Sequence, residues 1–143
     1  MTEVQRIAEV LGGEKILGQP IHTLAELNRL VMRGLPKSSL RFAAERVART
    51  NAEARDLVYR VVPESTYKRR KRLSPAESER SERLARTIAL AEFTWGENAA
   101  AHAWLNDANP HLDGSTPLEA AETELGARQV EEILMRAIYG IPA

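Results

Sequence analysis

Four short sequences, each a hydroxyl residue followed three positions later by glutamate, constrain the fold of this chain more than any other feature. They are TLAE, TNAE, SPAE and TPLE, which begin at Thr23, Thr50, Ser74 and Thr116. In such a capping box the hydroxyl accepts a hydrogen bond from the N–H of the glutamate, whose carboxylate reaches back to the N–H of the hydroxyl residue. Pro75 and Pro117 also occupy the first helical position, where a helix tolerates proline. Each sequence therefore predicts the start of an α-helix.

Apolar residues spaced three or four apart follow these starts, as in helices that bury one face. The predicted buried faces comprise Leu24, Leu27, Leu30 and Val31; Leu40, Ala43, Ala44 and Val47; Ala54, Leu57 and Val58; Leu84, Ile88, Ala91 and Trp95; Ala101, Trp104 and Leu105; and Val130, Ile133, Leu134, Ala137 and Ile138. A long helix is expected from Ser74 to a stop at Gly96. Because no strand pattern or internal repeat accompanies these faces, we predict an all-α fold.

Charge is divided unevenly along the 143-residue chain, although the whole chain is formally neutral. Residues 1–73 carry 15 Lys and Arg against 8 Asp and Glu, whereas residues 74–143 carry 5 Arg against 12 Asp and Glu. This asymmetry favours two surfaces with different partners, and a basic half suits a polyanion. The halves could instead attract each other within the fold or across a dimer. The change of sign at Leu73–Ser74 predicts two domains, residues 1–73 and residues 74–143.

The positive charge is concentrated in ESTYKRRKR, residues 64–72, where five consecutive cations follow Tyr67. Two short predicted helices, residues 51–60 and 64–72, flank the connection Val61-Val62-Pro63. This is the layout of a helix-turn-helix, whose second helix enters the DNA major groove. The connection has no glycine, and β-branched residues avoid positive φ, so we expect a turn that needs no left-handed residue.

If Tyr67 faces the core, the opposite face of this helix carries hydroxyls and cations. Hydroxyls suit phosphate contacts, and arginine can pair with the major-groove edge of guanine. The predicted DNA contacts are Ser65, Thr66, Lys68, Arg69 and Arg72. A run of cations is by itself more often only a solvated helix, and its position in a helix-turn-helix reverses that preference.

Few features point to catalysis, metal binding or a membrane. The chain has no cysteine, and His22, His102 and His111 lack metal-ligand spacing. His102 could approach Asp107 or Asp113 across one loop, although such pairs are more often surface pairs than catalytic dyads. No apolar run approaches the roughly 18 residues of a membrane helix, and no apolar signal core begins the chain. We expect a cytoplasmic protein that is not an enzyme and holds no metal.

Three longer segments resemble the antitoxins of the Xre/MbcA/ParS group, which pair with RES-type toxins. LGGEKILG followed by LAELNRLVMRGLP resembles the N-terminal portion of that family. STYKRRKRLSPAESERSERLARTIALAEFTWG resembles its recognition helix and the long helix after it. AHAWLNDANPHLDGSTPLEAAETELGARQVEEILMRAIYG resembles its toxin-binding region and is the most specific match. The resemblance implies an Xre-like helix-turn-helix bundle followed by a small helical toxin-binding domain.

The resemblance also implies a division of labour. The N-terminal part would bind operator DNA and repress the toxin–antitoxin operon. The C-terminal end would cover the active site of a RES toxin, an enzyme that acts on NAD. The antitoxin itself would use no cofactor and would form a homodimer.

The closing sequence AIYGIPA is the candidate toxin-contacting end. Its apolar residues and terminal carboxylate could enter a cleft whose cations bind phosphate. The predicted toxin contacts are Arg136, Tyr139, Gly140, Ile141, Pro142 and Ala143. A local alternative is that Gly140 only stops the helix and Ile141 folds back onto Met135. Trp95 and Trp104 have core spacing and are expected to be structural.

Two other functions stay open at this level. One is a pure protein-interaction module whose basic helix meets an acidic surface and never DNA. The other is a standalone helix-turn-helix regulator without a toxin partner.

Overall fold

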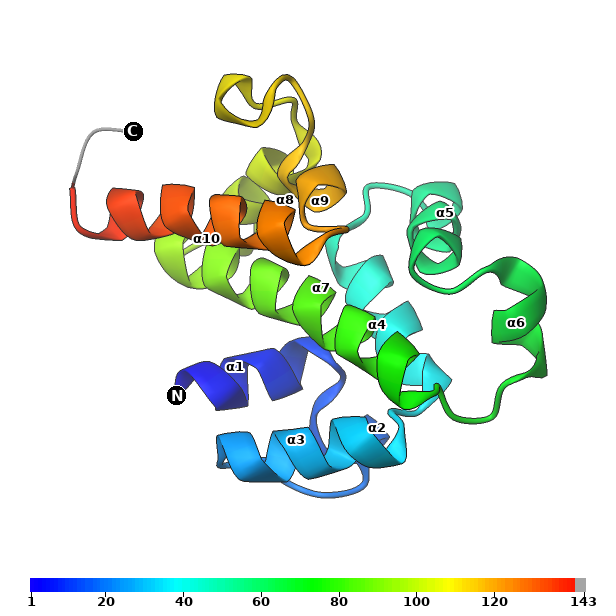
Figure 1. The fold of residues 1–143 in the computed structure, drawn as a ribbon. Helices are drawn as coiled ribbons and strands as arrows, with labels where there is room; N and C mark the ends of the chain where they lie inside the picture. The colour runs from blue at the N-terminus through cyan, green and yellow to red at the C-terminus, as the bar shows by residue number, and fades with distance from the viewer. Residues whose placement is uncertain (141–143) are drawn as a thin grey trace.

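The computed structural model describes residues 1–140, which form helices joined by short connections (Figure 1). Within these residues no strand forms, and Pro36 and Arg72 make an isolated antiparallel bridge. No helix in this part of the chain is long and apolar enough to span a membrane. The predicted all-α fold is confirmed. The elements are α1 (Glu3–Val10), α2 (Gly13–Leu17), α3 (Leu24–Arg33), α4 (Lys37–Val47), α5 (Asn51–Val61), α6 (Glu64–Arg69), α7 (Pro75–Trp95), α8 (Asn98–Asn106), the 3₁₀ turn η1 (Pro110–Leu112), α9 (Pro117–Ala120) and α10 (Glu124–Ile138).

The predicted helix starts are those of α3, α5, α7 and α9. Complete capping boxes form at Thr23, Ser74 and Thr116. At the start of α5 the hydroxyl of Thr50 accepts from the N–H of Glu53 at 3.1 Å, but the carboxylate of Glu53 accepts from the N–H of Arg49 at 3.2 Å. Local hydrogen bonding therefore sets all four starts, with one box half formed.

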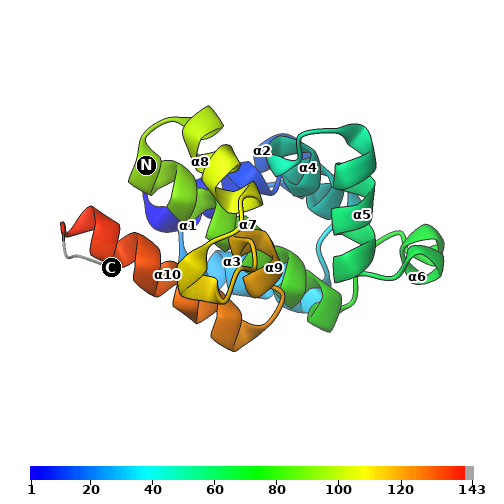
Figure 2. The same cartoon turned by 90° about the horizontal axis from the view of Figure 1, so that it is seen from above.

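Helix α7 is the central element of the structure. It packs against α1, α3, α4 and α5 from the first half of the chain and against α8 and α10 from the second. Figures 1 and 2 show α7 between these groups. The predicted seam at Leu73–Ser74 thus immediately precedes a helix that both halves share, and the two-domain division stays a prediction. One apolar cluster runs through both halves and includes Leu11, Leu35, Leu40, Ile88, Leu105 and Leu134.

The predicted buried faces are correct in the middle of the helices and wrong at several ends. Trp95 was expected in the core, yet it is 48% exposed in the last turn of α7. Leu24, at the start of α3, and Ala137 and Ile138, at the end of α10, are also exposed. Helical periodicity continues to the last residue of a helix, whereas burial also needs a neighbouring element to cover that turn. Trp104 is half-buried against the core.

A partly buried ion cluster links α4, α7 and α8. Arg46 donates from Nε and Nη2 to the carboxylate of Glu92 at 2.7 and 2.8 Å. Nε2 of His102 lies 2.7 Å from the same carboxylate. His102 therefore pairs with Glu92, and not with Asp107 or Asp113, which the sequence had offered only as possible neighbours. Burial alone would raise the pKa of Glu92, but the hydrogen bonds from Arg46 and His102 lower it below its ordinary value. The cluster therefore favours the charged carboxylate and holds the two halves together.

Candidate functional site

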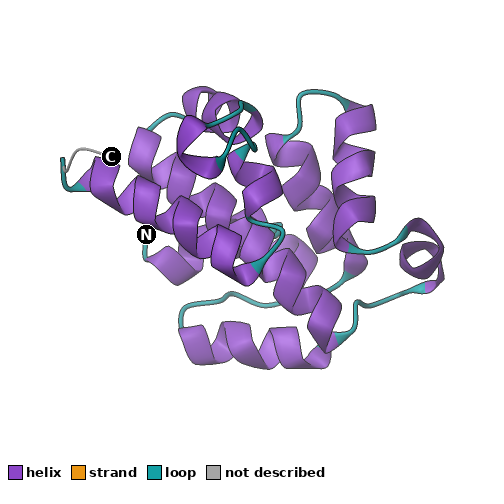
Figure 3. Ribbon diagram, turned by 45° about the horizontal axis from the view of Figure 1, so that its top comes forward, coloured by secondary structure: helices purple, strands orange, loops and turns teal. Residues whose placement is uncertain are grey.

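The predicted helix-turn-helix comprises α5 and α6, which lie at one edge of the molecule (Figure 3). Val62 and Pro63 join them in extended conformations, with φ/ψ of −135°/120° and −52°/146°. The side chain of Val62 is completely buried. The connection needs no residue with positive φ, which explains the absence of glycine and confirms the expected type of turn.

Tyr67 anchors α6, as predicted from its being the large apolar residue of this segment. It is the buried residue of this six-residue helix. Its hydroxyl donates to the carbonyl of Lys37 at 3.2 Å, and Nζ of Lys37 donates to the carbonyl of Tyr67 at 3.3 Å. The ring also meets the edge of Tyr59 with 6.0 Å between centroids, and burial raises the pKa of Tyr67. A single aromatic side chain thus fixes the recognition helix to α4 and α5.

The outer face of α6 presents Ser65, Lys68 and Arg69 to solvent, with Thr66 partly covered. Lys68 pairs with Glu64 one turn earlier at 2.9 Å. Nε of Arg69 donates to the carbonyl of Ser65 at 3.3 Å. Exposed pairs within one helix turn are weak, so these cations can exchange their partners for phosphate at small cost.

The helix ends at Arg69, not at Arg72 as predicted. Arg70 leaves the helix because its guanidinium makes two hydrogen bonds, of 3.1 and 3.2 Å, to the carboxylate of Glu77. Burial alone would raise the pKa of Glu77, but the bonds from Arg70 and the N–H of Ser74 lower it. Arg72 is exposed on the following connection, where its Nε donates to the carbonyl of Gly34 at 3.0 Å. Arg72 is therefore beside the recognition helix and does not belong to its outer face.

One further cation near this surface, Arg55, was not predicted. Arg55 of α5 is exposed and contributes to the lowered pKa of Glu64, which is due mainly to Lys68. The surplus charge of residues 1–73 was the available signal, but only the fold brings Arg55 close to Glu64 of α6.

The second predicted site lies at the end of α10. Arg136 is exposed and pairs with Glu132 at 3.1 Å, and Tyr139 is 69% exposed. Gly140 has a φ of +67°, and its N–H donates to the carbonyl of Ala137 at 3.3 Å, consistent with a helix stop. The other predicted contacts, and the alternative contact of one of them with Met135, lie outside the described residues; they are Ile141, Pro142 and Ala143.

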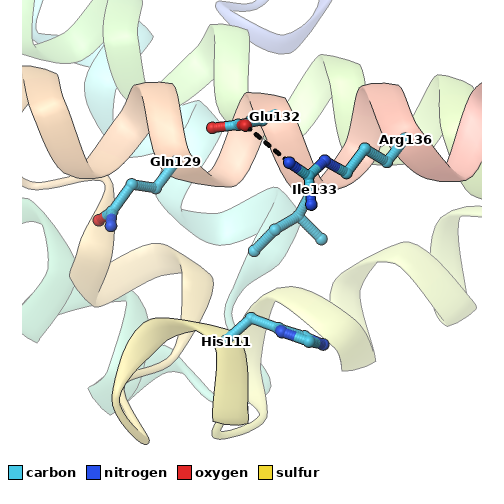
Figure 4. Close-up of a pocket in the computed structure, with 5 residues that line it drawn as sticks. All are labelled: His111, Gln129, Glu132, Ile133 and Arg136. Atoms are coloured by element: carbon cyan, nitrogen blue, oxygen red, sulfur yellow. Dashed lines mark hydrogen bonds and ion pairs between the residues drawn. The ribbon is translucent and has the colours of Figure 1, made fainter. Parts of the chain in front are cut away.

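A shallow pocket of about 220 Å³ flanks α10 beside the 3₁₀ turn. Figure 4 shows Glu132 and Arg136 joined by their ion pair on one side and His111 facing them from the turn. Gln129 and Ile133 complete its lining. This surface offers donors, acceptors and one apolar side chain, which suits contact with another protein better than a small apolar ligand.

The predicted DNA contacts and, of the predicted toxin contacts, Arg136, Tyr139 and Gly140 fall in segments that match known protein families. Residues 26–86 match the family model of the antitoxin Xre-like helix-turn-helix domain, and residues 90–140 match that of the antitoxin Xre/MbcA/ParS C-terminal toxin-binding domain. The chain is also 30% identical over 115 residues to Antitoxin Xre of Pseudomonas putida, covering 80% of this chain and 72% of that protein. The chain belongs to the Xre/MbcA/ParS family of antitoxins.

This antitoxin thus combines a DNA-binding helix-turn-helix domain with a toxin-binding domain. The first matched segment extends from α3 into α7, and the second from the last turns of α7 to Gly140. Helices α1 and α2 precede both segments. Among residues 1–140, no group of three His, Asp or Glu side chains is arranged to hold a metal ion.

Proposed function

We propose that this antitoxin neutralises a RES-type, NAD-consuming toxin by covering the toxin's active site with its C-terminal end. In the same proposal it acts in the cytoplasm as a homodimer, whose two α6 helices bind operator DNA and repress the operon. The supporting observation is that α6 and the end of α10 lie at opposite ends of the molecule (Figures 1 and 2). One chain can therefore hold toxin and DNA without either partner covering the other's surface.

The DNA part rests on the outer face of α6. Ser65, Lys68 and Arg69 are exposed there, with Thr66 beside them and Arg72 on the adjoining connection. These side chains can position the helix on phosphates, and an arginine can also read guanine. A dimer would present two such helices to the two half-sites of a palindromic operator.

The toxin part rests on the exposed end of α10. Arg136 and Tyr139 project there, and the chain continues beyond Gly140 into three further residues. The apolar side chains of Ile141 and Pro142 can enter a substrate cleft of the toxin. The proposed contacts remain Arg136, Tyr139, Gly140, Ile141, Pro142 and Ala143.

Two variants separate the two activities. Arg69→Ala should weaken operator binding about tenfold and should leave toxin inhibition intact. A tenfold loss of affinity corresponds to a binding free energy within the range of about one to three kcal/mol for an arginine–guanine contact. Deletion of residues 141–143 should restore NAD consumption by the toxin and leave operator binding intact. Arg128→Ala, an exposed change of equal charge on α10, is the matched control. Operator affinity that is insensitive to Arg69→Ala and to salt would contradict the DNA assignment, and full inhibition after the deletion would contradict the active-site cover.

A second candidate is a protein-interaction module that does not bind DNA. It is favoured by the observation that Arg70 and Lys68 already have carboxylate partners, Glu77 and Glu64. Absence of binding to the operon's promoter fragment at low salt would support it. Co-purification with the product of the adjacent gene distinguishes the antitoxin and the protein-interaction module from a standalone regulator without a toxin partner.

A further inference from the structure

A groove of about 340 Å³ runs between α1, the last turns of α7 and the end of α10. Its apolar lining is formed by Leu90 and Phe93 of α7 with Met135, Ile138 and Tyr139 at the end of α10. Phe93 is 52% exposed, and the last three are exposed as well. Exposed large apolar side chains gathered in one groove mark an interaction surface, unlike the same residues scattered singly.

Helix α1 contributes a cation to this groove. The guanidinium of Arg6 lies 4.1 Å from the centre of the Phe93 ring, a cation–π contact. Its Nη1 donates to the carbonyl of Met1 at 2.9 Å, and its Nε is buried without a hydrogen-bond partner. In the described part of the chain Arg6 has no carboxylate partner, unlike Arg86 across the groove, which pairs with Glu131 at 3.2 Å. The buried Nε is out of reach of a partner, but Nη2 makes no hydrogen bond within the described residues, and Arg6 therefore keeps this donor for an incoming group.

The position of the groove identifies the partner. Phe93, Met135, Ile138 and Tyr139 all belong to the segment that matches the toxin-binding domain, residues 90–140. The groove also opens at the end of α10, where the chain enters its proposed toxin-contacting tail. Arg6 is on α1, which precedes both matched segments. The groove is thus continuous with the toxin-binding surface and extends it onto a helix outside that domain.

We propose that this groove docks an apolar segment of the toxin, and that Arg6 receives a carboxylate or carbonyl of that segment. The inference rests on the proposed function, because it names a second contact area for the same partner. It assigns α1 a part in toxin recognition. Phe93 acts both as contact and as the platform that holds the guanidinium of Arg6 in place.

The test measures the affinity of the full-length chain for the purified product of the adjacent toxin gene. Phe93→Ala should weaken binding at least tenfold, as expected for a central aromatic contact, and Arg6→Gln about fivefold. Phe93 is exposed and Arg6 is partly exposed, and thermal melting verifies that each variant folds. Arg128→Ala, on α10 but outside the groove, should leave toxin affinity unchanged. None of these variants should alter operator binding.

The outcomes separate this inference from the proposed function. If the unaltered chain does not bind the toxin, the proposed function fails. If it binds but both groove variants bind equally well, only the docking groove is overturned. If Phe93→Ala changes the molar mass in light scattering while toxin affinity stays unchanged, the groove joins two copies of this chain, which also overturns the inference.

Discussion

The Arg46–Glu92–His102 cluster gives a quantitative test of how the two halves are held together. Replacing Glu92 by glutamine keeps the shape of the side chain but removes the charge that accepts from Arg46 and His102. The side chains of Glu92 and Arg46 are only 11% and 21% exposed, so water compensates poorly for the lost partner. Removing one member of a buried pair costs about 3–5 kcal/mol. Because some exposure remains, we expect the lower end, about 3 kcal/mol, or a fall in Tm of roughly 10 °C for a chain of this size.

The assay is urea unfolding followed by circular dichroism. The matched control is Glu132→Gln, which removes an exposed pair with Arg136 on α10 and should change the free energy of unfolding by less than about 0.5 kcal/mol. The double variant Arg46→Met with Glu92→Leu should be more stable than Glu92→Gln, since no unpaired charge stays buried. A loss below about 1 kcal/mol for Glu92→Gln, or one equal to that of the control, would refute the reasoning.

The same cluster predicts a pH dependence of stability. The pKa of Glu92 is lowered in the folded chain, so its contribution is complete above the ordinary value of 4.5 and is lost as pH falls through the lower folded pKa. Between pH 5 and the acid limit of folding, the native chain should therefore lose stability more steeply than Glu92→Gln. Parallel acid-induced unfolding of the two proteins would contradict this prediction.

Two further predictions concern the support of the recognition helix. Gly34 has a φ of +99°, and a Cβ there would lie 2.2 Å from the carbonyl oxygen of Leu73. Gly34→Ala should therefore destabilise the chain by more than about 2 kcal/mol in urea unfolding. The control is Gly96→Ala, at a φ of +71° with open space around it, which should cost only about 1 kcal/mol of backbone strain. Equal losses would argue against the close contact at Leu73. Tyr67→Phe removes the hydrogen bond to Lys37 and should cost about 1 kcal/mol while operator affinity persists. Tyr67→Ala should in addition lower operator affinity in fluorescence anisotropy, because α6 loses its anchor; unchanged affinity would contradict the anchoring role.

Much of the helical frame could be predicted because it depends on residues three or four positions apart. The capping hydroxyls at Thr23, Ser74 and Thr116 and the anchoring role of Tyr67 follow from such local patterns. The end of α6 could not be predicted in this way. Arg70 follows the last residue of α6 and donates to Glu77 on the next helix, and local helical periodicity does not indicate this partner.

The candidate surfaces show the same distinction. The basic run was visible in the sequence, and the outer face of α6 holds Ser65, Lys68 and Arg69 as expected. The groove beneath Phe93 was not visible, because Arg6 reaches that ring from α1, 87 positions earlier in the chain. Trp95 was misassigned for a related reason, since a helical pattern does not reveal where the covering helices end.

The sequence alone therefore determined the helical frame from α3 onward, the four capped starts and the separation of positive from negative charge, because capping, periodicity and composition are properties of short segments. It did not predict α1 and α2. Only the tertiary structure decided that α7 serves both halves, that Arg46 and His102 share the carboxylate of Glu92, and that α1 completes a groove with α10. These features join residues that are distant in the chain. Their positions depend on how whole helices pack, and no local pattern encodes that packing.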